Sequence, residues 1–372
     1  MKRAFLLLTL AAWLVGLSPA VAAVQLGGLI RGATKAKDAF DGVNITPEQE
    51  LQIGTRISEQ LRTRYGVVQN PDLHKYVTLV GRTVAAGARK QNLKWTFIVL
   101  DSDGVNAHAA PGGFVHITRG ALALIRTESE LAAVLGHEIA HVDLAHTIND
   151  LKKSNAIKTA KQLAPGEVIE NLATAAFTQV RGHVYDSKQE DAADEAALTL
   201  VNAAGYAPTS LGTFLERLVE RNQAIRDPKP DPKKILRNGM FSSHPEMQQR
   251  IADAHKTIEK NRLAAVATVT PRYAMTVKVT ALSVEDLAIK VADAQNNMSA
   301  AEKAEKGITS ATDTIASAKS LVGGAPTSRQ TPTAAQARNL NVDGDAPGGA
   351  NSTLVTVTVT AAELQTFRQG IA

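Results

Sequence analysis

The run His137-Glu138-Ile139-Ala140-His141 constrains this chain more than any other feature of its sequence. Two histidines four residues apart lie on one face of a helix, one turn apart. Their imidazole rings can bind one zinc ion, and the glutamate between them is a candidate general base. A catalytic zinc usually has three protein ligands and one open position, so a third ligand must come from another part of the chain.

The composition narrows the chemistry of that third ligand. The 372 residues include no cysteine. This excludes disulfides, thiolate ligands, a cysteine nucleophile and a lipid-modified N-terminal cysteine. One zinc ion per chain would therefore be held by histidine and carboxylate. The length allows a sizeable core and more than one domain.

The N-terminus has the pattern of a secretory signal peptide. Lys2 and Arg3 precede an apolar run over residues 4–17, and the small residues Ala20 and Ala22 form a cleavage pattern. The alternative is an uncleaved anchor helix, but the apolar run is too short to cross a bilayer comfortably. We therefore predict a cleaved signal peptide over residues 1–23 and a periplasmic protein that is not a lipoprotein.

The charge of the chain argues against nucleic-acid binding. The formal net charge of +5 falls to +3 when Lys2 and Arg3 leave with the signal peptide. This charge is too small to indicate a nucleic-acid partner, and no nucleic-acid motif is present. No later stretch is long and apolar enough to cross a bilayer.

Capping residues mark where helices are predicted to begin. Pro47 and Pro71 each follow an N-cap residue and have an acidic residue nearby. Thr127 and Glu130 form a T-x-x-E capping box ahead of the H-E-x-x-H run. Another long helix is predicted over residues 187–204.

Two β-rich runs, residues 95–100 and 114–118, predict strands. The fold class is therefore predicted to be α+β, with a mostly helical domain over residues 45–265 and a small antiparallel sheet. Residues 24–44 are rich in Gly and Ala and are predicted to be a flexible lead-in.

The composition changes after the predicted domain. Residues 283–322 are alanine-rich, and residues 323–352 have the Gly, Pro, Ala, Thr and Ser content of a linker. Residues 276–280 and 355–360 alternate like strands, so they either pair in a small appended module or share only low complexity. We predict a poorly ordered C-terminal extension over residues 266–372, with a short helix near its end.

Glu190 and Asp194 are the candidates for the third ligand and its support. They lie four residues apart near the start of a predicted helix, so one carboxylate can bind zinc while the other accepts a hydrogen bond from a ligand histidine. Alternatively, Ser187 and Glu190 form a capping box and Asp194 is merely solvated. His146 is interpreted as structural, because five helical residues turn it away from the face of His141.

Several further stretches accompany the H-E-x-x-H run in a fixed order. They are Asn106-Ala107-His108-Ala109-Ala110-Pro111-Gly112-Gly113, Thr118-Arg119-Gly120, Val142 with His146, Glu190 to Asp194, and His244-Pro245 with Arg250-Ile251. Together they resemble the gluzincin metallopeptidases of the CAAX prenyl protease and HtpX-like family, in its soluble periplasmic branch. The resemblance covers about residues 45–262. The chain departs from the family pattern at Ala192 and Ala193, where the family often has a second acid and an alanine.

The resemblance implies a zincin-type metallopeptidase domain with Glu190 as the third zinc ligand. It implies that Asp194 orients His137 or His141. It also places His244 near the active site, where it either gates the site or stabilises the oxyanion; the alternative is a histidine that only precedes a proline at a helix start.

Together with the strand pattern, the resemblance predicts that residues 114–118 form the sheet edge beside the cleft. An extended peptide can add to such an edge through main-chain hydrogen bonds. In the mechanism so implied, zinc activates a water molecule and Glu138 takes its proton as general base.

The predicted function is that of a zinc-dependent endopeptidase acting on unfolded or misassembled cell-envelope proteins, the envelope role being an analogy with the family. The alternative is a latent or non-catalytic envelope chaperone or scaffold, whose zinc site is closed by His244. A further hypothesis is that the C-terminal extension binds a peripheral outer-membrane or assembly-machinery partner.

Overall fold

The computed structural model describes residues 45–160, 162–163, 165–182, 185–223, 247–264, 267–296 and 343–371. The predicted signal peptide, the predicted lead-in and His244 lie outside these residues. The chain divides into two units, residues 1–46 and 47–372, and the described helices and strands belong to the second. Among the described helices, none combines the length and the apolar character that crossing a bilayer requires.

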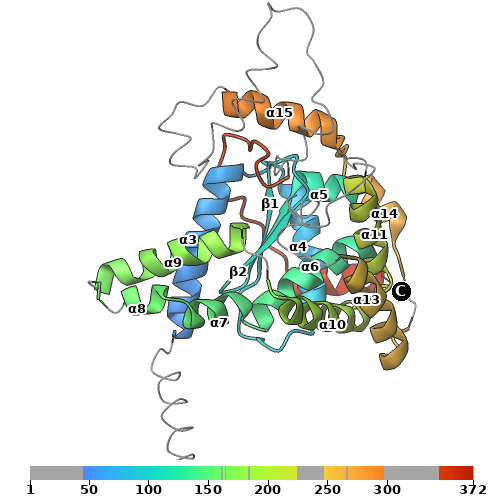
Figure 1. Ribbon diagram of the computed structural model, residues 1–372. Coiled ribbons are helices and arrows are strands. Elements are labelled where there is room, and N and C mark those ends of the chain that lie inside the picture. The colour runs from blue at the N-terminus through green and yellow to red at the C-terminus, as the bar shows by residue number, and fades with distance from the viewer. Residues whose placement is uncertain are drawn as a thin grey trace, which may run out of the picture. The chain divides into compact units, whose positions relative to one another are not determined.

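A three-stranded sheet lies at the centre of the second unit (Figure 1). Its strands are β1 (Thr96–Leu100), β2 (Ala107–Ala110) and β3 (Phe114–Thr118), in the order β1-β3-β2. A turn at Gly112 and Gly113, both with positive φ, reverses β2 into β3. β3 is antiparallel to β2 but parallel to β1. The α+β class is confirmed. The sheet, however, is mixed and not purely antiparallel, because β3 lies between β1 and β2 and runs parallel to the first and antiparallel to the second.

β3 is the central strand, so the prediction that residues 114–118 form the sheet edge is wrong. Ile117 pairs with Val99 of β1 on one side and with Ala107 of β2 on the other. A peptide therefore cannot add to β3. β2 was not predicted, because its sequence Ala-His-Ala-Ala has no β-branched residue to mark a strand.

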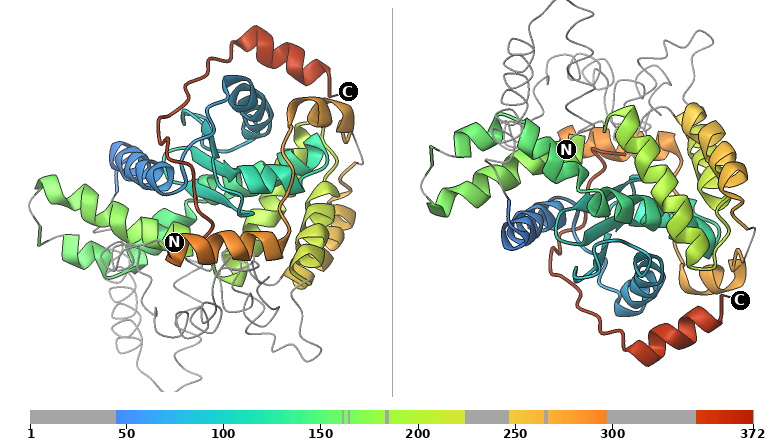
Figure 2. Two further views of the ribbon diagram at one scale, coloured as in Figure 1. Left: turned by 90° about the horizontal axis from the view of Figure 1, so that it is seen from above. Right: turned by 90° about the horizontal axis from the view of Figure 1, so that it is seen from below.

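Helices pack around this sheet, as the views in Figures 1 and 2 show. They are α3 (Pro47–Tyr65), α4 (Pro71–Ala85), α5 (Arg119–Leu124), α6 (Glu128–Asp143), α7 (His146–Lys153), α8 (Ala156–Ala160), α9 (Pro165–Gly182), α10 (Ser187–Ala203), α11 (Ser210–Gln223), α13 (Met247–Asn261), α14 (Thr270–Thr276), α15 (Val284–Asn296) and α19 (Ala361–Gln369). The predicted starts at Pro47 and Pro71 are confirmed. Asn70 is the N-cap of α4, where its side chain accepts a hydrogen bond from Leu73 N.

Helix α6 is buried along its whole length, and it packs against α4, α10, α11 and β2. A helix that is buried on every side belongs to the core and has little freedom to shift. Thr127 caps it as predicted, but the Glu130 side chain accepts from Arg126 N instead of closing the box on Thr127. The reciprocal half of the predicted capping box is therefore not formed.

Gly136 allows the close approach of α6 and α10. A Cβ atom at this position would lie 3.0 Å from Val201 Cγ2 of α10. A larger residue would therefore push α10 away from α6. Since Gly136 directly precedes His137, this contact brings α10 within reach of the H-E-x-x-H run.

The C-terminal residues 343–371 run along α3, β1 and α4, as Figure 2 shows in red. Val67 N donates to Asn351 O at 2.6 Å, and Gly349 N donates to Asp101 O at 2.8 Å. Asp343 is buried and pairs with Arg221 at 2.7 Å. This segment is therefore tied to the domain by main-chain hydrogen bonds and by a buried ion pair.

The predicted strands in the C-terminal region are not formed. Thr276 ends helix α14, and residues 277–280 and 355–360 belong to no strand. Arg82 Nη1 of α4 donates to Val359 O at 2.9 Å. The main chain at Val359 is therefore bound by an arginine side chain and not by a neighbouring strand. The short helix predicted near the C-terminus is confirmed as α19.

Candidate metal centre

Helix α6 brings His137 and His141 together on one face. Their Nε2 atoms lie 3.0 Å apart, and their rings meet edge to face with centroids 4.6 Å apart. Both side chains are buried. The spacing of four residues therefore places the two rings as predicted.

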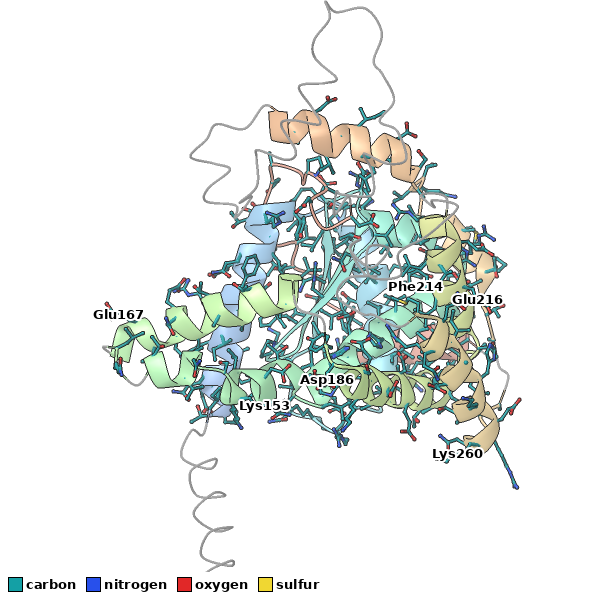
Figure 3. The ribbon with its side chains drawn as sticks, viewed as in Figure 1. Lys153, Glu167, Asp186, Phe214, Glu216 and Lys260 are labelled. Carbon is teal, nitrogen blue, oxygen red and sulfur yellow. The ribbon has the colours of Figure 1, made fainter. Side chains whose placement is uncertain are left out.

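Glu190, in the first turn of α10, completes the group. Its Oε2 lies 3.5 Å from His137 Nε2, and its Oε1 lies 3.5 Å from His141 Nε2. The N-cap of α10 is Asp186, labelled in Figure 3, and Gln189 closes the capping box with it. The alternative in which Ser187 and Glu190 form the box is therefore wrong.

The geometry and chemistry of the group fit a zinc ion. Tetrahedral zinc with bonds of about 2.0–2.2 Å places its ligand atoms roughly 3.3 Å apart. The separations of 3.0 and 3.5 Å between the ring nitrogens and the carboxylate oxygens agree with this value. Within the described part of the chain, His137, His141 and Glu190 are the group of histidines and acids that could hold a metal ion.

Asp194 lies one turn after Glu190 and supports His137. Its Oδ1 is 2.8 Å from His137 Nδ1. The N–H group at Nδ1 therefore donates a hydrogen bond to the carboxylate, and Nε2 keeps its electron pair free for a metal ion. Burial by itself would raise the pKa of Asp194, but Arg250 and His137 outweigh burial and hold that pKa well below its usual range. Asp194 is therefore an ionised acceptor.

Arg250 on α13 is the cation of this cluster. Its Nε and Nη2 donate to Asp194 at 2.8 and 2.7 Å, and its Nη1 lies 2.9 Å from Glu190 Oε2. Burial opposes the charge of Arg250, but attraction to both carboxylates raises its pKa above the usual value. In the sequence, Arg250 was only one residue of the resemblance. Nothing local indicated that it reaches both acids.

His146 and Tyr185 contact His141. His146 Nδ1 lies 2.8 Å from His141 Nδ1, and the Tyr185 ring stacks on His141 with centroids 3.9 Å apart. Burial lowers the pKa of His146. His146 is outside the ligand group, but it does not turn away from His141 as predicted. The reason is that α6 ends at Asp143, so the rotation of a continuous helix does not apply.

Glu138 is buried in the same part of α6, with 1% of its surface exposed. Burial raises the pKa of the Tyr185 hydroxyl, and the negative charge of Glu138 adds to this effect. Glu138 directly follows His137 in α6, so the two residues share one turn of the helix.

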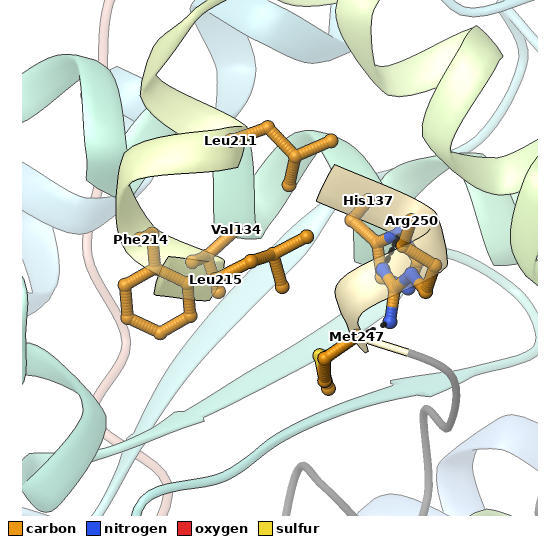
Figure 4. Close-up of a pocket in the computed structure, with 7 residues that line it drawn as sticks. All are labelled: Val134, His137, Leu211, Phe214, Leu215, Met247 and Arg250. Carbon is orange, nitrogen blue, oxygen red and sulfur yellow. Dashed lines mark hydrogen bonds between the residues drawn. The ribbon is translucent and has the colours of Figure 1, made fainter. Parts of the chain in front are cut away.

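An apolar pocket borders the group on the side of His137 and Arg250 (Figure 4). Its other lining residues are Val134 of α6, Leu211, Phe214 and Leu215 of α11, and Met247 of α13. The pocket places an apolar surface directly beside the candidate metal centre.

Among the histidines that the structure describes, only His137 and His141 belong to the group. His244 and His183 lie outside the described residues. His74 Nε2 lies 2.9 Å from Val68 O, and His116 Nε2 lies 2.9 Å from Ser58 Oγ. His255 is exposed.

Comparison with known proteins identifies the family of the chain. The model of peptidase family M48 matches residues 69–258, just over half of the chain. The chain belongs to peptidase family M48. Metallopeptidases of this family use zinc, and the buried His137-His141-Glu190 group is of the kind that can hold it.

Curated relatives with this domain differ in length and name. The beta-barrel assembly-enhancing protease of Escherichia coli (strain K12) is 27% identical over 235 residues, covering 59% of this chain and 46% of that protein. The mitochondrial metalloendopeptidase OMA1 of Schizosaccharomyces pombe is 27% identical over 180 residues, covering 47% and 53%. Metalloprotease LoiP of Escherichia coli is 22% identical over 221 residues, covering 57% and 82%. The chain thus spans about half the length of the first two relatives.

Proposed function

We propose that this chain is a zinc-dependent endopeptidase that hydrolyses peptide bonds of misfolded or unassembled cell-envelope proteins. The observation that carries the proposal is the convergence of His137, His141 and Glu190 from two helices, with Glu138 beside them. Membership of family M48 supports peptide hydrolysis. The name of the beta-barrel assembly-enhancing proteases supports an envelope substrate, and the pattern of residues 1–23 supports export to the periplasm.

In the proposed mechanism, the acid and base work falls to Glu138. His137, His141 and Glu190 would hold zinc, which would supply a Lewis acid for a water molecule and a peptide carbonyl. Glu138 takes a proton from the attacking water and returns it to the leaving amine. Asp194 holds His137 with its proton on Nδ1 throughout.

The fold supports this chemistry by holding the reacting groups in place before substrate binds. Helix α6 is buried on every side, and Arg250 fixes both Asp194 and Glu190. Such pre-organisation lowers the cost of reaching the transition state. The apolar surface beside His137 would contact a bound substrate.

The roles predicted for His244 and for the C-terminal extension remain proposals. His244 would gate the site or stabilise the oxyanion. The extension would contact a peripheral outer-membrane or assembly-machinery partner. Substituting Met275→Ser, an exposed apolar residue of the extension, and comparing the captured envelope proteins would test the latter without removing the extension's buried ion pairs, and an unchanged set would contradict it.

The test of the proposed activity is cleavage of casein, an unfolded protein substrate, by the purified full chain loaded with zinc. We expect cleavage that stops on adding a chelator and returns with zinc. Glu138→Gln should keep stoichiometric zinc and lose cleavage. The matched control is Glu130→Gln, because Glu130 is also buried in α6 but pairs with Arg217 away from the metal centre. The control should retain cleavage.

The same experiment separates the endopeptidase from the alternative function. A zinc-loaded wild-type chain that never cleaves casein would support the chaperone or scaffold with a closed site. Full activity of Glu138→Gln would remove Glu138 from the mechanism.

A further inference from the structure

The two histidines of the metal group are supported by different kinds of partner. His137 Nδ1 faces a carboxylate oxygen of Asp194 at 2.8 Å. His141 Nδ1 faces another ring nitrogen, His146 Nδ1, also at 2.8 Å. An ionised carboxylate can only accept a hydrogen bond, whereas an imidazole nitrogen can donate or accept. The orientation of His141 therefore depends on which nitrogen of His146 carries the proton.

The proton positions follow from the ligand role of His141. A ligand nitrogen uses its electron pair, so Nε2 of His141 carries no proton and the neutral ring has its proton on Nδ1. His146 Nδ1 must then accept, and the proton of His146 lies on Nε2. We propose that His146 is a positioning residue that fixes the tautomer and ring orientation of His141 by accepting this hydrogen bond. The inference rests on the proposed zinc site.

The backbone between the two histidines is shaped for this contact. Helix α6 ends at Asp143, and Ala145 adopts the left-handed conformation with φ 56° and ψ 35°. Residues other than glycine adopt this conformation only at a cost, and such strain collects at functional sites. The turn starts helix α7 at His146 and directs that side chain back to His141.

The end of α6 is itself anchored. Asp143 Oδ2 accepts from Arg89 N at 3.1 Å, and Oδ1 accepts from Lys90 N at 2.8 Å. Asp143 is thereby held where the helix stops. The left-handed turn at Ala145 therefore follows an anchored helix end, which fixes the position of His146.

Ring contacts restrict His141 further. Tyr185 stacks on one face of its ring, with an interplanar angle of 22°, and the Tyr185 hydroxyl lies 3.2 Å from Thr147 Oγ1. His137 and His146 meet the ring edge to face, with centroids 4.6 and 4.9 Å away. Stacking sets the plane of the ring, and the hydrogen bond to His146 selects which nitrogen faces the metal group.

The test compares zinc affinities, measured by competition with a chromogenic chelator. His146→Phe keeps a ring but offers no acceptor, and we expect a loss of about 10–100-fold. His146→Asn can place its side-chain oxygen near the position of Nδ1, and it should restore most of the affinity. His74→Phe is the matched control, because His74 is also buried but bonds to Val68 O. It should bind zinc like the wild type.

Two further measurements separate positioning from general stability. The visible spectrum of the cobalt-loaded protein should change in His146→Phe and not in His74→Phe. Nitrogen-15 spectra of the zinc-loaded wild type should show the proton of His141 on Nδ1 and that of His146 on Nε2. This wild-type measurement stands even where a variant fails to fold.

The outcomes distinguish the inference from the proposed function. A wild-type chain that binds no stoichiometric zinc overturns the proposed function. A wild type that binds zinc with the same affinity as His146→Phe overturns the positioning role alone. A proton found on His146 Nδ1 in the zinc-loaded wild type also overturns it.

Discussion

The two ends of helix α6 hold buried acids and bases in opposite ways. At the first turn, Glu128 accepts from Tyr76 Oη at 2.8 Å, from Tyr206 Oη at 2.7 Å and from Arg272 Nε at 2.6 Å. At the far end, His137 and His141 face each other and Glu190 at 3.0–3.5 Å. The first cluster surrounds an acceptor with donors, and the second gathers ligand atoms around a common point.

This difference distinguishes a structural cluster from a functional one. A buried carboxylate is stable when donors match its oxygens, as they do at Glu128 and, through Arg217, at Glu130. The ring nitrogens and carboxylate oxygens of the second cluster lie within reach of one metal cation, which would stabilise them. Breaking the first cluster should therefore cost folding free energy, and breaking the second should cost metal binding.

The largest effect is expected from Glu190→Gln. The change removes a charged ligand, so zinc affinity should fall by at least about a hundredfold, beyond the usual effect of an outer-shell partner. Casein cleavage should be lost, while the zinc-free protein should lose less stability to urea than Glu128→Gln does, because Arg250 keeps both of its hydrogen bonds to Asp194. Stoichiometric zinc in this variant, seen by chelator competition, would contradict the ligand role of Glu190.

Glu128→Gln should show the reverse pattern. It leaves Arg272 without its buried partner, and we expect the free energy of unfolding to fall by about 2–3 kcal/mol, since Arg272 keeps partial contact with water. Zinc affinity should stay at the wild-type value. Urea unfolding with chelator present measures the first quantity. Equal stability of variant and wild type would show that the cluster is not structural.

Acid should weaken the fold even without metal. Burial lowers the pKa of His116 to about 3, and burial also lowers that of His74. The unfolded chain then binds protons below pH 6.5 that the folded chain does not bind, so stability is present above pH 6.5 and is lost as the pH falls. For His116 the loss is about 1.4 kcal/mol per pH unit between 6.5 and about 3.

Urea unfolding of the zinc-free protein across this pH range measures the slope. The double variant Ser58→Ala with His116→Leu removes the histidine and its hydrogen-bonding hydroxyl together. In this variant the free energy of unfolding should depend less steeply on pH, by about 1.4 kcal/mol per pH unit, which corresponds to one bound proton. An unchanged slope would mean that His116 does not contribute.

The smallest effect is expected at the left-handed turn before His146. Ala145→Gly relieves the strained φ of 56° but increases the freedom of the unfolded chain. The net result should be a gain of about 0.5 kcal/mol in the free energy of unfolding, with zinc affinity retained. A clear loss of stability in urea would show that the turn is not strained.

Features that depend on neighbouring residues were predictable from the sequence. Asn70 and Thr127 cap their helices because a capping side chain binds a main-chain group only three residues away. His137 and His141 share a face because the helix repeats every 3.6 residues. The pair Glu190 and Asp194 was identified in the same way, but its spacing also allowed a capping reading, which only the observed box at Asp186 excluded.

Features that depend on chain direction or on packing were not predictable locally. The strand β2 has no β-branched residue, and the parallel pairing of β1 with β3 follows from the order of strands in the sheet. His146 lies beyond the point where α6 ends, so helical rotation misplaced it.

By itself, the sequence determined the identity of the candidate ligands, the helix that carries two of them and the absence of thiolate chemistry. Only the tertiary structure decided that Glu190 meets both imidazoles, that Arg250 holds Glu190 and Asp194, and that His146 returns to His141. The reason is physical: periodicity and capping act over one or two helical turns. The convergence of separate helices on one point depends instead on the close packing of α6, α10 and α13, which no short stretch of sequence contains.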